Sequence, residues 1–163
     1  MVYRSAVAHA IPCGELRGGG AAASLAGMSD LELCERYVAL WNEPAEEARR
    51  AGVRALWRED GRHLLQAPVE IRERAEALGF PAATLEVRGH HALETRVARA
   101  YRDFVAGGEH SFRLRGEPTR VGDAIRVDWD MVDPAGAIQA GGTDVLVLDA
   151  EDRIRSDYQF IDQ

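Results

Sequence analysis

Lysine is absent from this sequence of 163 residues, and all 20 of its basic residues are arginine. The chain therefore cannot form a Schiff base through lysine, and it has no lysine for a Walker-A phosphate loop. Cysteine is scarce as well, with Cys13 near the N-terminus and Cys34 in an expected helix. Two cysteines in these positions do not supply a disulfide scaffold or a cysteine-rich zinc site, so a reducing cytoplasm is the simplest compartment.

Long hydrophobic runs and blocks of positive charge are also missing. The formal net charge is −7, which opposes binding to nucleic acid, because phosphate neutralisation needs a basic face. Residues 1–27 lack a continuous apolar region of signal-peptide strength, and we expect no membrane partner. We predict that 1–27 is a disordered, vector-derived or mis-annotated extension and that 28–163 is one domain, and Met28 is a candidate natural start.

Helices are expected first along the chain. Ser29 and Glu32 have the spacing of a capping box, and apolar residues then recur at helical spacing. Pro44 suits the start of a second helix, and Gly107-Gly108 suits the end of a later one. We expect helices over 29–42, 45–58 and 91–105, and a weaker helix over 68–78.

From His110 onward the hydrophobic period changes to two, which is typical of strands. We expect strands over 62–66, 110–120, 124–132, 137–148 and 153–161. Short connections such as Asp133-Pro134-Ala135-Gly136 favour antiparallel pairing. The prediction is an α+β domain with three main helices on one side of a curved, mostly antiparallel sheet, which leaves room for a cone-shaped cavity.

Asp144 is the most informative residue, because it interrupts the apolar face of an expected buried strand. The residues in its register are Ile138, Ala140, Gly142, Leu146 and Leu148. A buried carboxyl is normally paired, hydrogen-bonded or kept neutral by a raised pKa, and a neutral acid can donate a hydrogen bond in catalysis. Asp144 therefore indicates a small-molecule pocket, and a structural hydrogen bond or an arginine partner is the alternative.

Three segments carry a resemblance to a known family. These are 35–40 in the first expected helix, 56–61 at the end of the second, and 142–154 near the C-terminus. They resemble the nuclear transport factor 2-like superfamily over about 28–163. That superfamily includes SnoaL-like polyketide cyclases, ketosteroid isomerases, limonene-type epoxide hydrolases and non-catalytic members. The resemblance implies a cone-shaped, cystatin-like α+β fold, and it leaves the activity open.

Within that superfamily, the resemblance to ketosteroid isomerases places Tyr37 at their oxyanion-hole tyrosine and Asp144 at their protonated aspartic acid. Their general-base aspartate would fall within 62–68, where this chain has no acidic residue. The two donors can still serve without that base, since an acid held neutral in an apolar site can polarise a carbonyl. For Tyr37 the alternative is a core tyrosine whose hydroxyl caps a nearby group.

The resemblance to limonene-type epoxide hydrolases places Arg126 and Asp128 at their Arg-x-Asp pair. Their second catalytic aspartate would fall on Gln159. The expected apolar face of this strand contains Ile125, Val127, Trp129 and Met131. Strand alternation therefore points Asp128 outward, as a solvated or dimer-facing partner of Arg126, unless a bulge shifts the register.

Asp157 lies on the last expected strand, where the resemblance places it toward the cavity. It would then face Asp144, and two close carboxyls push their pKa values apart, leaving one acid and one base. The alternative is that Asp157 pairs with an arginine such as Arg155, while Tyr158 and Phe160 form the buried face. Alternation along the strand by itself favours this alternative.

The leading hypothesis is a cofactor-independent enzyme that cyclises, isomerises or hydrates a small carbonyl or polyketide-like molecule. Asp144 and Tyr37 would stabilise an oxyanion, and Asp157 or His63 would move the proton. The remaining candidate substrate-binding residues are Trp129, Gln159, Gln66, His63 and Met131. Alternatives are a non-catalytic binding or assembly module and an epoxide hydrolase. We expect a homodimer through the outer sheet face, no metal, and a helix within 68–87 that is either a lid or a surface helix.

Overall fold

The computed structural model of the protein describes residues 27–80 and 84–162. The helices in this part of the chain are α1 (Asp30–Asn42), α2 (Glu46–Leu56), α3 (Val69–Ala77) and α4 (His90–Ala100), which continues into the π-helical turn η1 (Tyr101–Val105). The strands are β1 (Trp57–Gln66), β2 (Thr84–Arg88), β3 (Ser111–Leu114), β4 (Thr119–Val121), β5 (Ala124–Val132), β6 (Ile138–Leu148) and β7 (Ile154–Ile161). The extension expected over 1–27, with Cys13, lies outside the described residues apart from Gly27.

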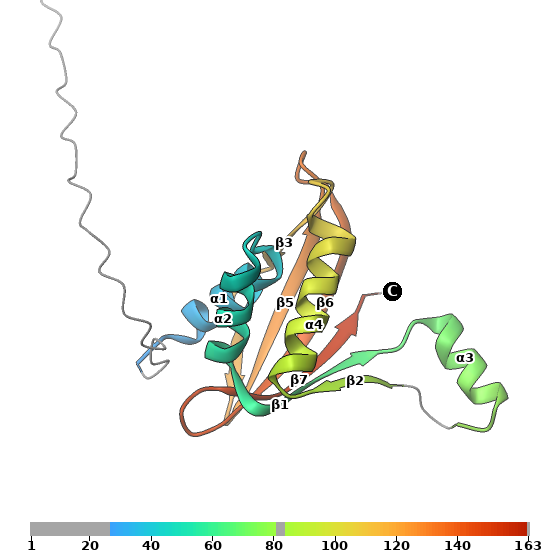
Figure 1. The fold of residues 1–163 in the computed structure, drawn as a ribbon, viewed down its shortest axis with the longest axis horizontal. Coiled ribbons are helices and arrows are strands. Elements are labelled where there is room, and N and C mark those ends of the chain that lie inside the picture. Colours follow the sequence, from blue (N-terminus) through green and yellow to red (C-terminus); the bar gives the residue numbers. More distant parts are fainter. Residues whose placement is uncertain (1–26, 81–83, 163) are drawn as a thin grey trace, which may run out of the picture.

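The strands form one sheet in the order β2-β1-β7-β6-β5-β3, with β4 also paired to β5. The pairing of β1 with β7 is parallel and the other pairings are antiparallel. Helices α1, α2 and α4 pack against one face of the sheet, while α3 stands apart beyond the β1 and β2 strands (Figure 1). The predicted α+β class and mostly antiparallel sheet are confirmed. None of the helices described is long and apolar enough to span a membrane.

The predicted start of α1 is confirmed, because Ser29 and Glu32 form a complete capping box. The predicted end of α2 at residue 58 is wrong. Trp57 leaves the helix and pairs with Ile154 of β7, so β1 is much longer than the expected 62–66. Tertiary pairing has overridden the helical preference of this segment, as it often does at the boundary between two elements.

Two further differences concern the strands. The single strand expected over 110–120 is divided into β3 and β4 at Gly116, whose φ of +72° belongs to a conformation that glycine adopts at little cost. Strand β2 was not predicted. It is an edge strand with exposed residues, so it lacks the alternation of buried and exposed positions by which a strand is recognised.

A β-bulge at Arg155 decides which side chains of β7 face the core. In the pairing with β6, Leu148 lies opposite Ile154, and Val147 lies opposite Ser156, so Arg155 is the extra residue. Beyond the bulge, Asp157 lies on the buried side. The sequence-based alternative in which Tyr158 and Phe160 are buried is therefore wrong, because it assumed an uninterrupted alternation.

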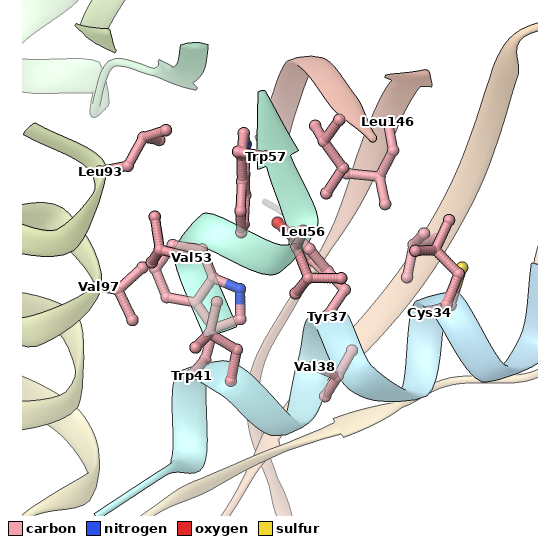
Figure 2. Packing of buried hydrophobic residues seen from close by; sticks show 14 of the residues in the cluster. Cys34, Tyr37, Val38, Trp41, Val53, Leu56, Trp57, Leu93, Val97 and Leu146 are labelled. Atoms are coloured by element: carbon pink, nitrogen blue, oxygen red, sulfur yellow. The ribbon is translucent and has the colours of Figure 1, made fainter. Parts of the chain in front are cut away.

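The core lies between the helices and the sheet (Figure 2). It contains Val53, Leu56 and Trp57 from the α2–β1 segment, Leu93 and Val97 from α4, and Leu146 from β6. Tyr37 and Trp41 from α1 lie in the same cluster, so the tyrosine ring is held among apolar side chains. A rigid apolar frame of this kind fixes the position of the few polar groups inside it.

We predict that Gly142→Ala destabilises the protein. A Cβ atom at Gly142 would lie 2.5 Å from the carbonyl oxygen of Phe160 and 2.5 Å from the ring of Trp129. Relief of this overlap should cost about 1–3 kcal/mol of the free energy of unfolding, measured with urea. The control is Gly107→Ala, whose nearest neighbour, Glu109 Cγ, is 3.8 Å away. Equal free energies of unfolding for the two variants would contradict the prediction and show that the neighbouring strand and the Trp129 ring can move to make room for the added methyl group.

Candidate functional site

A cavity of about 420 Å³ lies within the domain, in the size range of small-molecule pockets. Much of its wall is apolar and includes Val38, Trp41, Leu65, Phe104, Phe112 and Met131. The polar groups that line its inner part come from separate elements: Tyr37 from α1, Arg96 from α4, Asp144 from β6 and Gln159 from β7. A mostly apolar pocket with a few convergent polar groups can orient an apolar molecule and act on one part of it.

The Tyr37 hydroxyl lies between two buried carboxyl groups. Its oxygen is 2.8 Å from Asp144 Oδ2 and 2.8 Å from Asp157 Oδ2. A tyrosine hydroxyl has one hydrogen to donate, so it can donate to one of these carboxyls at a time. The other short contact needs a proton on the carboxyl, which then donates to the tyrosine oxygen. The geometry thus corresponds to a cluster in which at least one carboxyl is protonated.

The pKa values of both carboxyls are raised by their burial. Complete burial, together with the nearby charge of Asp144, raises the pKa of Asp157 well above its usual range. Burial raises the pKa of Asp144 to about 7, and the polar side chains of Tyr37, Gln159 and Trp129 act in the opposite direction. Burial and both carboxyls also raise the pKa of Tyr37. The two short contacts and these shifts favour a proton on fully buried Asp157 and on Tyr37 near neutrality, which leaves Asp144, on the cavity wall, as the carboxyl that titrates.

His63 is a second neighbour of Asp157. Its Nε2 atom is 3.9 Å from Asp157 Oδ2, and the residue is buried. Burial lowers the pKa of His63 to about 3, with the positive charge of Arg96 acting in the same direction. His63 is therefore neutral at pH 7, and it does not form a salt bridge with protonated Asp157.

No family model matches the chain, and no curated protein matches it significantly. Solved structures do match. A candidate isomerase of the SnoaL-like family from Agrobacterium tumefaciens is 28% identical, with a TM-score of 0.63 over 80% of this chain and 95% of that chain. A nuclear transport factor 2-like protein from Exiguobacterium is 18% identical, with a TM-score of 0.55 over 80% of this chain and 98% of that chain.

The chain has the nuclear transport factor 2-like fold, and it is similar over most of its length to a protein of the SnoaL-like family. A third structure, of a candidate polyketide cyclase from Sinorhizobium meliloti, shares the fold at 12% identity, with a TM-score of 0.50 over 78% of this chain and 93% of that chain. The resemblance seen in the sequence, and the α+β fold that it implied, are thus confirmed.

The structure separates the predicted site residues into two groups. Those that line the pocket are Tyr37, Asp144, Gln66, Trp129, Met131 and Gln159. Asp157 and His63 do not line the cavity. Asp157 contacts the Tyr37 hydroxyl, and His63 lies beside Asp157. The suggested pairing of Asp157 with Arg155 is wrong, because the bulge turns Arg155 outward toward Asp123.

Arg126 and Asp128, the pair suggested for epoxide opening, lie outside the pocket. Their side chains pair with each other at 2.9 Å, and the Arg126 side chain is 62% exposed. Asp128 also accepts a hydrogen bond from Thr143. The regular alternation of β5 is maintained here, so both side chains lie on the outer face. The geometry matches the solvated-pair interpretation and does not favour an epoxide hydrolase.

Arg96 is a charged pocket residue that sequence reasoning missed. It lies on α4 between Leu93 and Ala100, which are both buried, so it shares their face of the helix. A charged residue in an apolar helical stripe is the same type of signal that made Asp144 informative on its strand. Applied to α4, that criterion would have selected Arg96.

Proposed function

We propose that this protein is a cofactor-independent acid–base enzyme that moves a proton at a carbon atom next to a carbonyl group, as isomerases and cyclases do. The observation that carries the proposal is Asp144, a buried carboxyl on the pocket wall with its pKa raised to about 7. A general base works best when its pKa is near the working pH. The names of the isomerase and cyclase structures with this fold are consistent with such chemistry.

In the proposed reaction Asp144 removes a proton from the substrate carbon. The electron pair of the broken C–H bond moves into the carbonyl group and gives an enolate, and protonated Asp144 then returns the proton at the same or another carbon. Asp144 Oδ1 accepts no hydrogen bond of normal distance and angle from the described residues, so it is available to take the proton, while the nearby side chains of Gln159 and Trp129 offset part of the rise in its pKa. The indole Nε1 of Trp129 also has no partner there, and it is a candidate donor to the enolate oxygen.

Asp157 and Tyr37 are positioning residues in this proposal. Protonated Asp157 donates to the Tyr37 oxygen, and Tyr37 donates to Asp144 Oδ2, which favours the ionised form of Asp144. The sequence-based hypothesis assigned the donor role to Asp144 and the base role to Asp157. The opposite assignment is better supported, because Asp144 lines the cavity and Asp157 does not.

The test is solvent exchange of a carbon-bound proton. The purified chain is incubated in D₂O with 4-phenyl-2-butanone, a neutral apolar ketone, and loss of the protons next to the carbonyl is followed by NMR. We expect exchange whose rate rises with pH through about 7 and then levels off, because ionised Asp144 is the base. Binding of the ketone without exchange at any pH would instead identify the chain as a binding module.

The homodimer expected from the sequence remains a prediction, which analytical ultracentrifugation can test.

A further inference from the structure

Arg96 has no ion pair or hydrogen bond with any residue in 27–80 or 84–162, although its side chain lines the cavity. Its guanidinium carbon lies 5.4 Å from the centre of the Trp41 ring, which holds it by a cation–π contact. Its neighbour on the helix, Arg99, is paired with Asp103 instead. The Arg96 nitrogens are not among the buried polar atoms without a partner in the described part of the chain, so they are open to the cavity and can bind a ligand there.

The charges around Arg96 do not neutralise the pocket. The groups that act on it are Tyr37 on α1, Asp144 on β6, Asp157 on β7 and Arg99 on its own helix, and Arg96 in turn acts on His63 of β1. Tyr37, His63 and Asp157 are uncharged near neutrality, for the reasons given above. This leaves one titrating carboxyl, Asp144, which binds Tyr37 and not Arg96.

A second guanidinium lies at the α3 side of the same cavity. Arg72 lines the pocket, and its Nε atom is buried without a hydrogen-bond partner among the described residues. The other carboxylate on the pocket wall, Asp162, is bound by Arg115 at 2.8 Å and is therefore already neutralised. The cavity thus combines apolar walls with two arginines that have free hydrogen-bonding capacity. Its two carboxyl groups, Asp144 and Asp162, are already bound by Tyr37 and Arg115.

From this arrangement we infer that the ligand of the pocket is an apolar carbonyl compound that carries a carboxylate, and that Arg96 binds this carboxylate. Arg96 can form two parallel hydrogen bonds to a carboxylate, which orients the ligand as well as attracting it. Arg72 adds positive potential at the α3 side of the cavity. A 2-oxo acid with an aromatic or alkyl body fits these requirements. The inference names the substrate class for the proposed function and rests on it for the reaction, but anion binding can be measured without turnover.

The experiment compares two ligands that differ in charge. Binding of 2-oxo-4-phenylbutanoate and of its neutral amide to the full chain is measured by calorimetry or by quenching of tryptophan fluorescence. We expect the acid to bind more tightly, and Arg96→Met to weaken binding of the acid by about 10- to 100-fold while changing binding of the amide little. Arg96→Lys, which keeps the charge but loses the planar fork, should give an intermediate loss.

Arg99→Gln is the matched control, because Arg99 lies one turn away on the same helix and its side chain is 72% exposed. It should bind both ligands as the unmodified chain does. The inference is overturned if the acid does not bind, if acid and amide bind equally, or if Arg96→Met weakens both alike. Exchange of the neutral ketone with equal binding of acid and amide would retain the proposed function and reject the anion. Selective binding of the acid without exchange of the ketone would retain the anion site and reject the proposed function.

Discussion

Asp144→Asn should reduce the rate of proton exchange by about 10²- to 10⁴-fold, the usual contribution of a general base. Asparagine has nearly the same shape and can still accept a hydrogen bond from Tyr37, but it cannot take up a proton. The effect should therefore appear in the rate, with the melting profile and the affinity for 4-phenyl-2-butanone largely retained. NMR exchange in D₂O and a binding titration on the same sample measure the two quantities separately.

Two variants show whether such a loss is specific. Asp128→Asn removes a carboxylate on the outer face that is bound to Arg126, and it should leave exchange unchanged. Tyr37→Phe removes the hydroxyl between Asp144 and Asp157, which should raise the pKa of Asp144 and move the rise of the pH profile to higher pH. An unchanged exchange rate in Asp144→Asn would refute the assignment of Asp144 as the base. A reduced exchange rate in Asp128→Asn would show that the pair of Arg126 and Asp128 takes part in the reaction.

Asp144→Asn should also make the protein more stable at alkaline pH. The pKa of Asp144 is about 7 in the folded protein, against an ordinary value of 3.8. Between these values the folded state retains a proton that the unfolded state loses, so the stability due to this group is lost as the pH rises through about 7. Asparagine avoids that loss, which amounts to at most about 4 kcal/mol at about pH 8 and is smaller at about pH 5.

Urea unfolding of the two proteins at both pH values measures this difference. Asp157 contributes in the same direction, and because the charge of Asp144 is part of what raises its pKa, Asp144→Asn also removes part of the Asp157 contribution and adds to the gain at alkaline pH. His63 acts oppositely, because its pKa is lowered to about 3 and its contribution is lost as the pH falls below its ordinary value of 6.5. The His63 contribution does not depend on Asp144 and cancels in the comparison.

Asp130→Asn is the control for this prediction. Asp130 is buried to a similar extent as Asp144, but it is paired with Arg113 at 3.1 Å and with Arg115 at 3.4 Å. Its removal leaves two arginines without their shared partner, so it should destabilise the protein. If Asp144→Asn also destabilised the protein at alkaline pH, Asp144 would be a structural carboxylate and its role as a base would be rejected.

Several features of the fold could be predicted because their causes are local. The capping box of Ser29 and Glu32 places the start of α1, and the apolar alternation around Asp144 identifies both a buried strand and its anomalous residue. The end of α2 could not be predicted, because Trp57 is held in β1 by a partner almost a hundred residues away. Strand β2 was missed for a related reason, since its definition comes from pairing with β1 and not from burial.

The amino-acid sequence was sufficient to predict the nuclear transport factor 2-like fold, its α+β class, and the placement of Asp144 and Tyr37 in one pocket. Tertiary contacts were needed to establish that Asp157 faces inward, because one bulge at Arg155 reverses the direction of the side chains after it. They also place a single hydroxyl hydrogen between two carboxyls, and leave Arg96 without a hydrogen-bond partner among the described residues. Burial and hydrogen-bond pairing depend on segments that are distant in the sequence. The pKa values of Asp144 and Asp157 and the free guanidinium of Arg96 follow from that burial and pairing.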